Sequence, residues 1–255
     1  MKALGIIPAR YASTRFPGKP LAMIGGLSMI RRVYEQCMKC PDLARVIVAT
    51  DSREIFRHVK DFGGEVMMTS GKHRSGTERC AEVLAKVRKG RGAVKPDAVI
   101  NIQGDEPFID PGQISQVALA FGDRHTDIAT LAKRITAARE ITDPNVVKVV
   151  FAAGGPALYF SRSPVPFLRN HPPADWLKKG VFYKHVGIYG YRPEILGRIV
   201  TLPESPLETA ESLEQLRWLE AGFRIIIRET EYDTIAIDTP SDLLKITNIK
   251  PRKRR

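Results

Sequence analysis

The chain has 255 residues, 43% of them hydrophobic and 27% charged, a composition typical of a soluble globular protein with room for one large α/β domain or two small ones. Its apolar runs are strand-sized, which excludes a membrane-spanning helix, and the N-terminus carries no cleavable signal pattern, so we expect a cytoplasmic protein. The net charge of +12 favours anionic partners; because it is scattered without interleaved aromatic residues, apart from a basic tail at 250–255, we expect small anionic substrates and no nucleic acid.

Strand-like and helix-like segments alternate through the first half of the chain. The apolar run at 3–7 ends at Pro8 and predicts a buried strand, and Ser28 is a good N-cap for the amphipathic helix that follows it. Further strands are expected at 45–49, 65–68 and 97–102, and further helices at 53–62 and 77–89. This alternation predicts a Rossmann-like, mostly parallel mixed sheet sandwiched by helices.

After about residue 123 the pattern changes to strands with only short helical pieces between them. The segment 164–180 is rich in proline, and we interpret it as an excursion from the domain that could serve as a dimer arm. We expect one domain over 1–249 with an inserted arm or sugar-binding subregion at about 155–192. The expected strands of this half are 127–133, 146–151, 157–160, 185–191, 224–229 and 234–237, and the expected helices are 207–221 and 240–248.

The three cysteines, Cys37, Cys40 and Cys80, are an odd number that fits a reducing compartment without disulfides. A structural zinc site would need two ligands beyond the Cys37/Cys40 pair. A thioredoxin-type pair sits at a helix N-terminus, whereas this one stands at a helix end, before Pro41. Core packing is therefore favoured over a redox or metal role.

The loop after the first strand is a candidate phosphate site. It brings Arg10, Arg15 and Lys19 together with two hydroxyls and Gly18 within about a dozen residues. Fixed cations, hydroxyl donors and exposed backbone N–H groups suit a triphosphate. The loop matches neither a Walker sequence nor a GxGxxG motif. The alternative is a basic surface turn.

Two carboxylates follow predicted strands. Asp105 comes after the buried strand at 97–102, and Asp238 comes after 234–237, directly before Thr239 and Pro240. Ligands bind at the carboxyl ends of parallel strands, and carboxylate oxygens suit Mg²⁺. If the two side chains converge, they can hold a cation that bridges phosphate oxygens. The alternative for Asp238 is a contribution to capping the last helix, for which Thr239 is a plausible N-cap.

Beyond these loops, sequence blocks over nearly the whole chain resemble one family. They occur in the order found in the CMP-Kdo synthetases, the 3-deoxy-manno-octulosonate cytidylyltransferases. The blocks are IPARYASTRFPGKPL (7–21), ATD (49–51), HRSGTER (73–79), NIQGDEP (101–107), ALYFSR (157–162), HVGIYGY (185–191), EQLR (214–217) and IDTP (237–240).

The resemblance implies a fold of the nucleotide-diphospho-sugar transferase type, a homodimer, and a set of site residues. Catalytic roles would fall to Arg10, Lys19, Asp105 and Asp238, the two aspartates holding Mg²⁺. The nucleotide CTP would be bound by Arg10, Ser13, Lys19, Ser75, Gly76, Thr77 and Gln103. The sugar pocket would be lined by Gln103, Arg162, His185, Tyr189, Glu211 and Gln215, the last two being one helical turn apart.

The implied reaction joins CMP from CTP to Kdo for lipopolysaccharide synthesis. The anomeric 2-hydroxyl of Kdo would attack the α-phosphate and displace pyrophosphate, with catalysis by alignment and charge neutralisation. The sequence departs from the family pattern at Arg74, at 232–236 and in the excursion at 164–180. The alternatives are a cytidylyltransferase for a related acid sugar, such as 8-amino-Kdo or a sialic-type sugar, and a nucleotide-binding protein without turnover.

Overall fold

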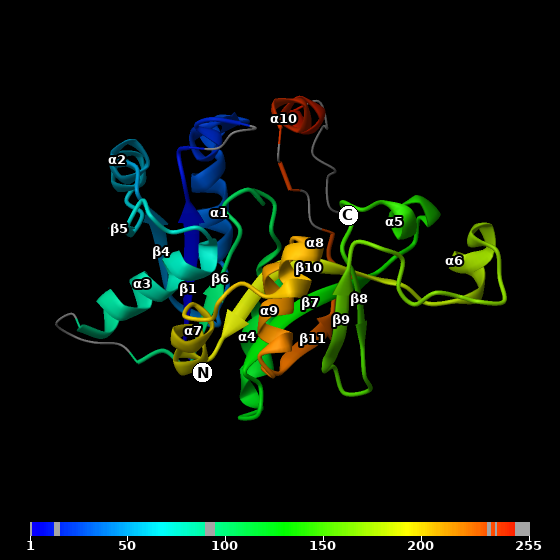
Figure 1. Cartoon of the computed structure of the whole chain (residues 1–255). Coiled ribbons are helices and arrows are strands. Elements are labelled where there is room, and N and C mark those ends of the chain that lie inside the picture. The colour runs from blue at the N-terminus through cyan, green and yellow to red at the C-terminus, as the bar shows by residue number, and fades with distance from the viewer. Residues whose placement is uncertain (1, 13–15, 90–94, 234–235, 238, 248–255) are drawn as a thin grey trace.

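The computed structural model describes residues 2–12, 16–89, 95–233, 236–237 and 239–247. Its centre is a mixed sheet with the strand order β11-β7-β10-β6-β1-β4-β5 (Figure 1). Neighbouring strands pair in parallel except at β10, which runs antiparallel to both β6 and β7. The predicted Rossmann-like, mostly parallel sheet is confirmed. The strands are β1 (Ala3–Ala9), β4 (Leu43–Thr50), β5 (Val66–Met68), β6 (Ala98–Asn101), β7 (Ile128–Arg134), β10 (Tyr183–Tyr191) and β11 (Ile225–Glu229).

Helices cover both faces of this sheet, and the side chains of β1 alternate between the two resulting cores. Ile7 packs with α1 (Met29–Cys37), α2 (Arg53–Asp61) and α4 (Pro111–Leu119). Ile6 packs in the other core with α3 (Gly76–Lys89) and α7 (Pro193–Ile199). A strand that is buried on both faces reads as a continuous apolar run, which is why the sequence at 3–7 shows no alternation.

The cysteines belong to these cores. Cys37 and Cys40 lie in the first core and Cys80 in the second, and all three are free thiols with buried side chains. Burial raises the pKa of Cys37 and of Cys80 well above the ordinary value of a thiol, so these two groups stay protonated. The core-packing interpretation is confirmed for these residues.

The N-terminal and C-terminal parts of the chain meet above the sheet. After the 3-10 turn η1 (Lys19–Leu21), the hairpin of β2 (Met23–Ile24) and β3 (Leu27–Ser28) leads into α1, whose N-cap is Ser28 as predicted. The last helix, α10 (Pro240–Thr247), begins with Asp242 N–H donating to Thr239 Oγ1. A small cluster of Ile24, Met29 and Ile237, with Phe16 and Leu243 against it, joins these parts (Figure 1).

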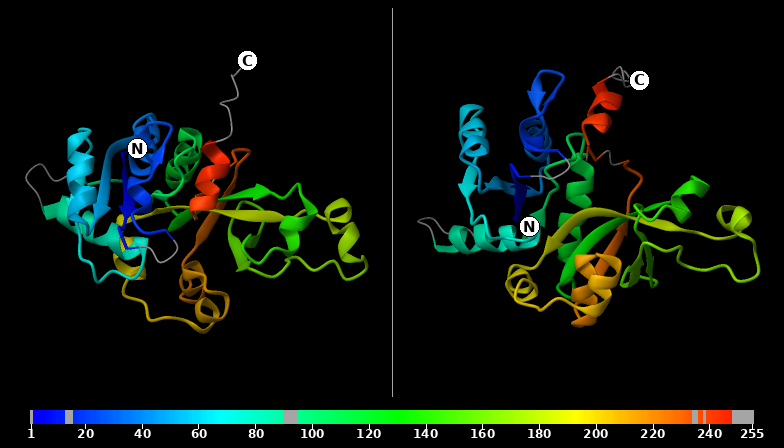
Figure 2. Two further views of the ribbon diagram at one scale, coloured as in Figure 1. Left: turned by 90° about the horizontal axis from the view of Figure 1, so that it is seen from above. Right: turned by 45° about the horizontal axis from the view of Figure 1, so that its top comes forward.

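A projecting arm carries the segment that the sequence marks as an excursion. The strands β8 (Lys148–Phe151) and β9 (Ala157–Ser161) pair with each other, and β8 pairs with β10. Beyond β9 the chain runs outward to η3 (Pro173–Asp175) and α6 (Trp176–Lys179), which lie at the far end of the molecule from β5 (Figures 1 and 2). A separate apolar cluster that includes Trp176, Phe182 and Ile135, together with α5 (Ala138–Thr142) through Ile141, holds the arm together.

Two predicted elements are wrong in detail. The helix predicted over 207–221 is two helices, α8 (Pro206–Glu211) and α9 (Glu214–Glu220), because Ser212 adopts the left-handed conformation with φ 52° and breaks the turn. Ala236 and Ile237 of the strand predicted at 234–237 do not pair with the sheet, while Thr234 and Ile235 lie outside the described residues. Ile237 is buried in the small apolar cluster instead.

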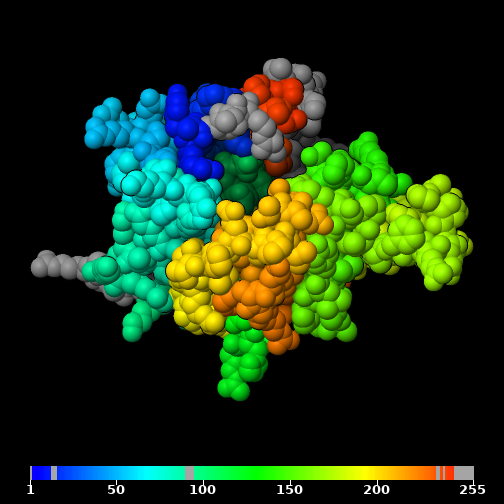
Figure 3. Space-filling model, viewed as in Figure 1, coloured from blue at the N-terminus to red at the C-terminus, as the bar shows by residue number. Residues whose placement is uncertain are grey.

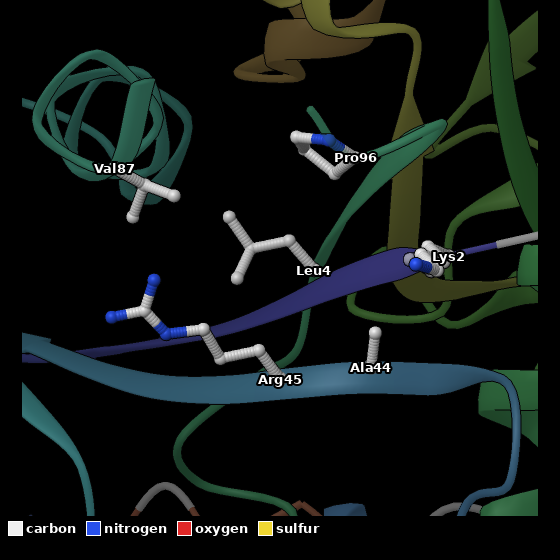
Figure 4. A pocket seen from close by; sticks show the side chains of 7 residues that line it. Lys2, Leu4, Ala44, Arg45, Val87 and Pro96 are labelled. Carbon is white, nitrogen blue, oxygen red and sulfur yellow. The ribbon is translucent and has the colours of Figure 1, made fainter. Parts of the chain in front are cut away.

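Two hollows lie at the starts of the parallel strands, opposite the carboxyl ends where a ligand is expected. One has a volume of about 10 Å³, room for about one water molecule, and Leu4, Val87 and Pro96 line it (Figure 4). The other has a volume of about 220 Å³ and lies between Tyr34, Met38 and Glu65. No helix in the described part of the chain is long and apolar enough to cross a membrane.

Candidate active site

Three loops meet where β1 ends. A Cβ atom on Gly104 would lie 2.8 Å from the carbonyl oxygen of Pro8, so the loop after β6 packs backbone against backbone on the end of β1. A Cβ atom on Gly76 would lie 3.4 Å from Pro8 Cγ and 3.5 Å from Asn101 Nδ2. The molecular surface is hollowed here, between the blue and cyan N-terminal segments and the yellow-to-orange segment, with the dark green chain after β6 as its floor (Figure 3).

The loop after β1 places Lys19 at this floor. Lys19 Nζ lies 2.7 Å from Asp105 Oδ2, and the two side chains are 15% and 27% exposed. The amide of Gly18 donates to the carbonyl of Tyr11, which closes the loop, and the φ of 69° at Gly18 is one that favours glycine. Arg10 follows β1 and is exposed. Ser13, which is among the predicted phosphate ligands, and Arg15 lie outside the described residues.

Asp105 is the accessible one of two adjacent acids. Glu106 is 6% exposed, and burial, together with the charge of Asp105, raises the pKa of its carboxyl to about 7. The amide of Ile237 donates to the carbonyl oxygen of Asp105 at 3.0 Å. The residue directly before Asp238 is therefore bonded to Asp105, although Asp238 itself lies outside the described residues.

The predicted nucleobase segment begins α3. Ser75 Oγ accepts a hydrogen bond from the amide of Glu78 and so acts as the N-cap. The next residue, Gly76, packs closely against Pro8, as described above. Thr77 is 2% exposed, and its hydroxyl donates to Glu214 Oε2 at 2.9 Å. The Thr77 side chain is thus turned inward, against the first residue of α9.

A buried arginine holds the segment before α3. Arg79 is 1% exposed and bonds to Thr69 Oγ1, and its Nη2 lies 3.1 Å from Asp51 Oδ2. Asp51 follows β4 and belongs to one of the sequence blocks that carry the family resemblance. Its role in the structure is to tie the end of β4 to α3.

On the other side of the hollow, β10 bulges. The register between β10 and β7 shifts between Val186 and Tyr189, and the carbonyl of Gly187 accepts a hydrogen bond from Gln103 Nε2 at 2.8 Å. Gln103 thereby connects the loop after β6 with the β10 bulge. His185 and Tyr189, which flank this bulge, are 5.2 Å apart between ring centroids.

Both rings have properties of a polar ligand site. The Nε2 atom of His185 lies 2.9 Å from Thr130 Oγ1, and burial lowers the pKa of the imidazole to about 3, so the ring is neutral at pH 7. The Tyr189 hydroxyl is buried and has no hydrogen-bond partner among the residues that the structure describes. Buried polar groups are almost always bonded, so this hydroxyl is available to a bound hydroxyl or water.

Glu211 and Arg162 are bonded to each other's segments. The Glu211 carboxylate accepts from Ser161 Oγ at 2.7 Å and from the Arg162 amide at 2.8 Å. The Arg162 guanidinium donates to the carbonyl oxygens of Glu211, Ser212 and Pro144. Gln215 is 5% exposed and lies in α9, so Glu211 and Gln215 do not share a helix face, and the helical-turn argument for them is wrong.

The comparisons with known proteins agree with this arrangement. A family model described as cytidylyltransferase matches residues 4–227. The chain belongs to this family. It is 51% identical to the 3-deoxy-manno-octulosonate cytidylyltransferase of Parabacteroides distasonis over 96% of both chains, and 54% identical to that of Bacteroides thetaiotaomicron over 95% of this chain and 96% of the relative. A solved structure of CMP:2-keto-3-deoxy-manno-octonic acid synthetase in complex with CTP is 43% identical, with a TM-score of 0.88 over 97% of both chains.

A more distant structure shows the fold alone. A glucose-1-phosphate thymidylyltransferase from Bacillus anthracis is 18% identical, with a TM-score of 0.62 over 98% of both chains. The expected nucleotide-diphospho-sugar transferase type of fold is thereby confirmed for this cytidylyltransferase.

Sequence reasoning missed the role of Glu214 and the partner of Arg74. Glu214 contacts the nucleobase segment directly, although only Glu211 and Gln215 of this part of the chain are predicted site residues. Arg74 bonds to Glu204 Oε1 at 3.1 Å across 130 residues. Glu214 belongs to the EQLR block, and this membership could have marked it as a site residue. Its partner Thr77, however, lies in α3, far away in the sequence. Nothing in the sequence pairs Arg74 with Glu204.

Among the described residues, no group of three or more His, Cys, Asp or Glu side chains gathers as a metal site. The donor chemistry nevertheless fits Mg²⁺, because Asp105 offers a partly exposed carboxylate and the chain bonded to it leads directly into Asp238. Lys19 supplies a second cation at the same carboxylate. An anionic triphosphate would find both positive charge and a hard-cation ligand at this point.

Proposed function

We propose that this cytidylyltransferase transfers CMP from CTP to the anomeric 2-hydroxyl of Kdo and releases pyrophosphate. Relatives that are about half identical over nearly their whole length are named for this activity, and the similar solved structure is a complex with CTP. The observation that carries the proposal is the Lys19–Asp105 contact of 2.7 Å at the carboxyl ends of β1 and β6. This contact supports the proposal because a lysine ammonium can bind phosphate and a carboxylate can bind Mg²⁺.

In this proposal the triphosphate lies over the loop after β1. Arg10, Ser13 and Lys19 bind its phosphates, and the backbone of 75–77 contacts the cytosine edge. Gly76 and Gly104 pack against Pro8, so the loops leave no side chain between the nucleotide and the sheet. A nucleotide bound close to the backbone is held in one orientation, which presents its α-phosphate to the second substrate.

Asp105 and Asp238 would hold Mg²⁺, which would supply neutralising charge to the phosphate oxygens. The protein residues have a separate task. Lys19 and Arg10 stabilise the negative charge that develops as pyrophosphate leaves, and Lys19 is already held in place by Asp105.

The acid sugar would bind across the hollow, against the β10 bulge. Gln103, His185 and Tyr189 face it, with Arg162, Glu211 and Gln215 forming the far wall. The low pKa of His185 leaves a neutral imidazole, and Tyr189 offers a buried hydroxyl without a described partner. These groups orient the sugar by hydrogen bonds, so that its 2-hydroxyl reaches the α-phosphate in line with the leaving pyrophosphate.

We also propose that the chain forms a homodimer through the arm. Phe167 is 71% exposed and lies edge-on to Trp176, with ring centroids 5.2 Å apart, and Val181 nearby in the chain is 46% exposed. Exposed aromatic and aliphatic groups on a projecting segment are typical of a contact surface. A second copy of the chain is the partner that the family resemblance implies.

The test is pyrophosphate release with CTP, Mg²⁺ and Kdo, run in parallel with ATP, GTP and UTP and with 8-amino-Kdo and a sialic acid. Release that requires both CTP and Kdo supports the proposal. Faster release with 8-amino-Kdo or a sialic acid would assign the enzyme to that sugar. Binding of CTP without release for any acid sugar would overturn catalysis and favour a nucleotide-binding protein.

A further inference from the structure

One of the hydrogen bonds between the two sides of the candidate site joins Thr77 to Glu214. Thr77 Oγ1 donates to Glu214 Oε2 at 2.9 Å, and the two residues are 137 positions apart in the chain. Thr77 is the second residue of α3, and Glu214 is the first residue of α9. The start of the nucleobase segment is therefore bonded directly to the start of the helix on the sugar side.

The Glu214 carboxylate is held from more than one direction. Ser75, the N-cap of α3, also bonds to it, and Arg217 Nη2 lies 3.7 Å from Oε1. Burial raises the pKa of this carboxyl, while its hydroxyl partners Thr77 and Ser75 lower it. The Glu214 side chain is 30% exposed, and these bonds tie the first residue of α9 to Ser75 and Thr77 at the start of α3.

The other end of this connection reaches the residues proposed for the sugar. Gln215 follows Glu214 directly and is 5% exposed. The corner before α9 is the left-handed Ser212, whose carbonyl accepts from Arg162 Nη2 at 3.4 Å. Glu211, on the other side of the corner, is bonded to β9. A shift of α9 therefore moves Gln215 relative to Glu211 and Arg162.

We infer that Glu214 is a positioning residue that couples the binding of the two substrates. This inference rests on the proposed function. A nucleotide that orders 75–77 fixes the Thr77 hydroxyl, which in turn fixes α9 and the sugar-side residues attached to it. The ordering is then complete before the acid sugar binds, so the sugar binds more tightly to the nucleotide complex than to the free enzyme.

Titration calorimetry can measure the coupling without turnover. The nucleotide is a CTP analogue in which a methylene group replaces the oxygen between the α- and β-phosphates, so that no pyrophosphate can leave. We expect the analogue to lower the Kd of Kdo about tenfold in the wild type. By reciprocity, Kdo lowers the Kd of the analogue by the same factor, which gives an internal check.

The matched variants differ by one hydroxyl. Thr77→Val keeps the shape of the side chain but cannot donate, and we expect the coupling to fall to less than about twofold. Thr77→Ser keeps the donor and should retain most of the coupling. Thermal unfolding of both variants shows whether α3 is still in place. Coupling in Thr77→Val equal to that of the wild type would overturn the inference.

Failure of the inference can be told from failure of the proposed function. If the wild type binds neither the CTP analogue nor Kdo, the proposed function is wrong. If it binds both and each affinity is independent of the other ligand, the reaction assignment stands and the coupling role of Glu214 is wrong. If Thr77→Val and Thr77→Ser both unfold, the comparison is made at Glu214 instead. Glu214→Gln keeps an acceptor oxygen and Glu214→Ala does not. Undiminished coupling in a Glu214→Ala variant that binds both ligands contradicts the role of Glu214.

Discussion

The Lys19 ammonium and the Asp105 carboxylate, separated by 86 residues in the sequence, lie 2.7 Å apart at the carboxyl ends of β1 and β6. Parallel pairing of these two strands brings the loops that follow them together. The backbone at Gly104 also packs closely against Pro8 at the end of β1. In a partly exposed site such a pair contributes little to stability by itself. The pair does place the Lys19 ammonium beside the Asp105 carboxylate, where both can act on a bound triphosphate in the proposed function.

Asp105→Asn should reduce turnover by about 10²–10³-fold while the protein stays folded, because only the charge of the ligand oxygen changes. Pyrophosphate release at saturating CTP and Kdo measures the loss, and circular dichroism checks the fold. Activity within about threefold of the wild type over a range of Mg²⁺ concentrations would contradict the metal role of Asp105.

Lys19→Ala should lower kcat/KM for CTP by about 10–100-fold, since a charge-assisted hydrogen bond to phosphate is lost. Lys39→Ala is the matched control, because Lys39 is an exposed lysine just after α1 whose ammonium donates to Gln36 Oε1. Steady-state kinetics and thermal unfolding are measured for both variants. A large loss of thermal stability in Lys19→Ala, with kinetics of the folded fraction unchanged, would show that the loop is a structural turn.

Arg74→Gln should change little, although Arg74 bridges the nucleobase loop to Glu204. The two side chains are 71% and 61% exposed, and an ion pair of that exposure is screened by solvent and salt. We expect KM for CTP to rise less than about threefold in low salt and not at all in about 0.5 M NaCl. A rise of tenfold or more that persists in high salt would mean that Arg74 contacts the nucleotide directly.

Local sequence signals account for most of the fold. The apolar run of β1 and the Ser28 cap are both encoded by neighbouring residues, and each lies where the sequence predicts it. The break at Ser212 has no such signal, because neither glycine nor proline marks it. The left-handed serine is held by tertiary bonds: Arg162 donates to its carbonyl, and Ser161 of β9 donates to the carboxylate of the neighbouring Glu211.

In the site, too, the positions of loops could be predicted from the sequence, whereas contacts between distant residues could not. The topological rule for parallel sheets placed the loops that carry Lys19 and Asp105 at one edge, but their direct pairing could only be seen in the fold. Glu214 stood between two predicted site residues and was passed over, because its partner Thr77 comes from α3. Thr77 itself was expected to bind nucleotide, and its buried side chain instead faces α9.

Glu211→Ala should destabilise the protein by about 2–3 kcal/mol, because it leaves the Ser161 hydroxyl and the Arg162 amide without an acceptor. Glu211→Gln keeps one acceptor and one donor in place, and we expect a loss of about 1 kcal/mol. Urea unfolding measures both. KM for Kdo should rise in both variants if Glu211 lines the sugar pocket, and unchanged stability together with unchanged KM would remove Glu211 from both roles.

Phe167→Ser should convert a dimer to a monomer without loss of the folded core. Phe167 contacts Trp176 at its edge but is otherwise exposed, so its removal costs the isolated chain little. Leu119→Ser is the control, because Leu119 is 61% exposed at the end of α4, away from the arm. Light scattering after size exclusion gives the mass. A wild type that is monomeric at all concentrations, or a Phe167→Ser variant that stays dimeric, would contradict the dimer arm.

His185 should make stability fall in mild acid. Its pKa is about 3 in the folded protein and about 6.5 in the unfolded chain, so between these values the unfolded chain binds the extra proton. The free energy of unfolding therefore decreases as the pH falls from 6.5 towards 3. Because the ring keeps some exposure, we expect a loss of about 1–2 kcal/mol between pH 6.5 and pH 5 from this group.

The measurement is urea unfolding of the wild type and of His185→Gln at a series of pH values. His185→Gln cannot take up the proton, so the difference between the two proteins should change by about 1–2 kcal/mol from pH 6.5 to pH 5, to the disadvantage of the wild type. His125→Gln, which alters an exposed histidine, is measured in the same way as a control. Parallel curves for the wild type and His185→Gln would mean that the imidazole is already solvated in the folded protein, and the neutral hydrogen-bonding role proposed for it in the sugar pocket would lose its basis.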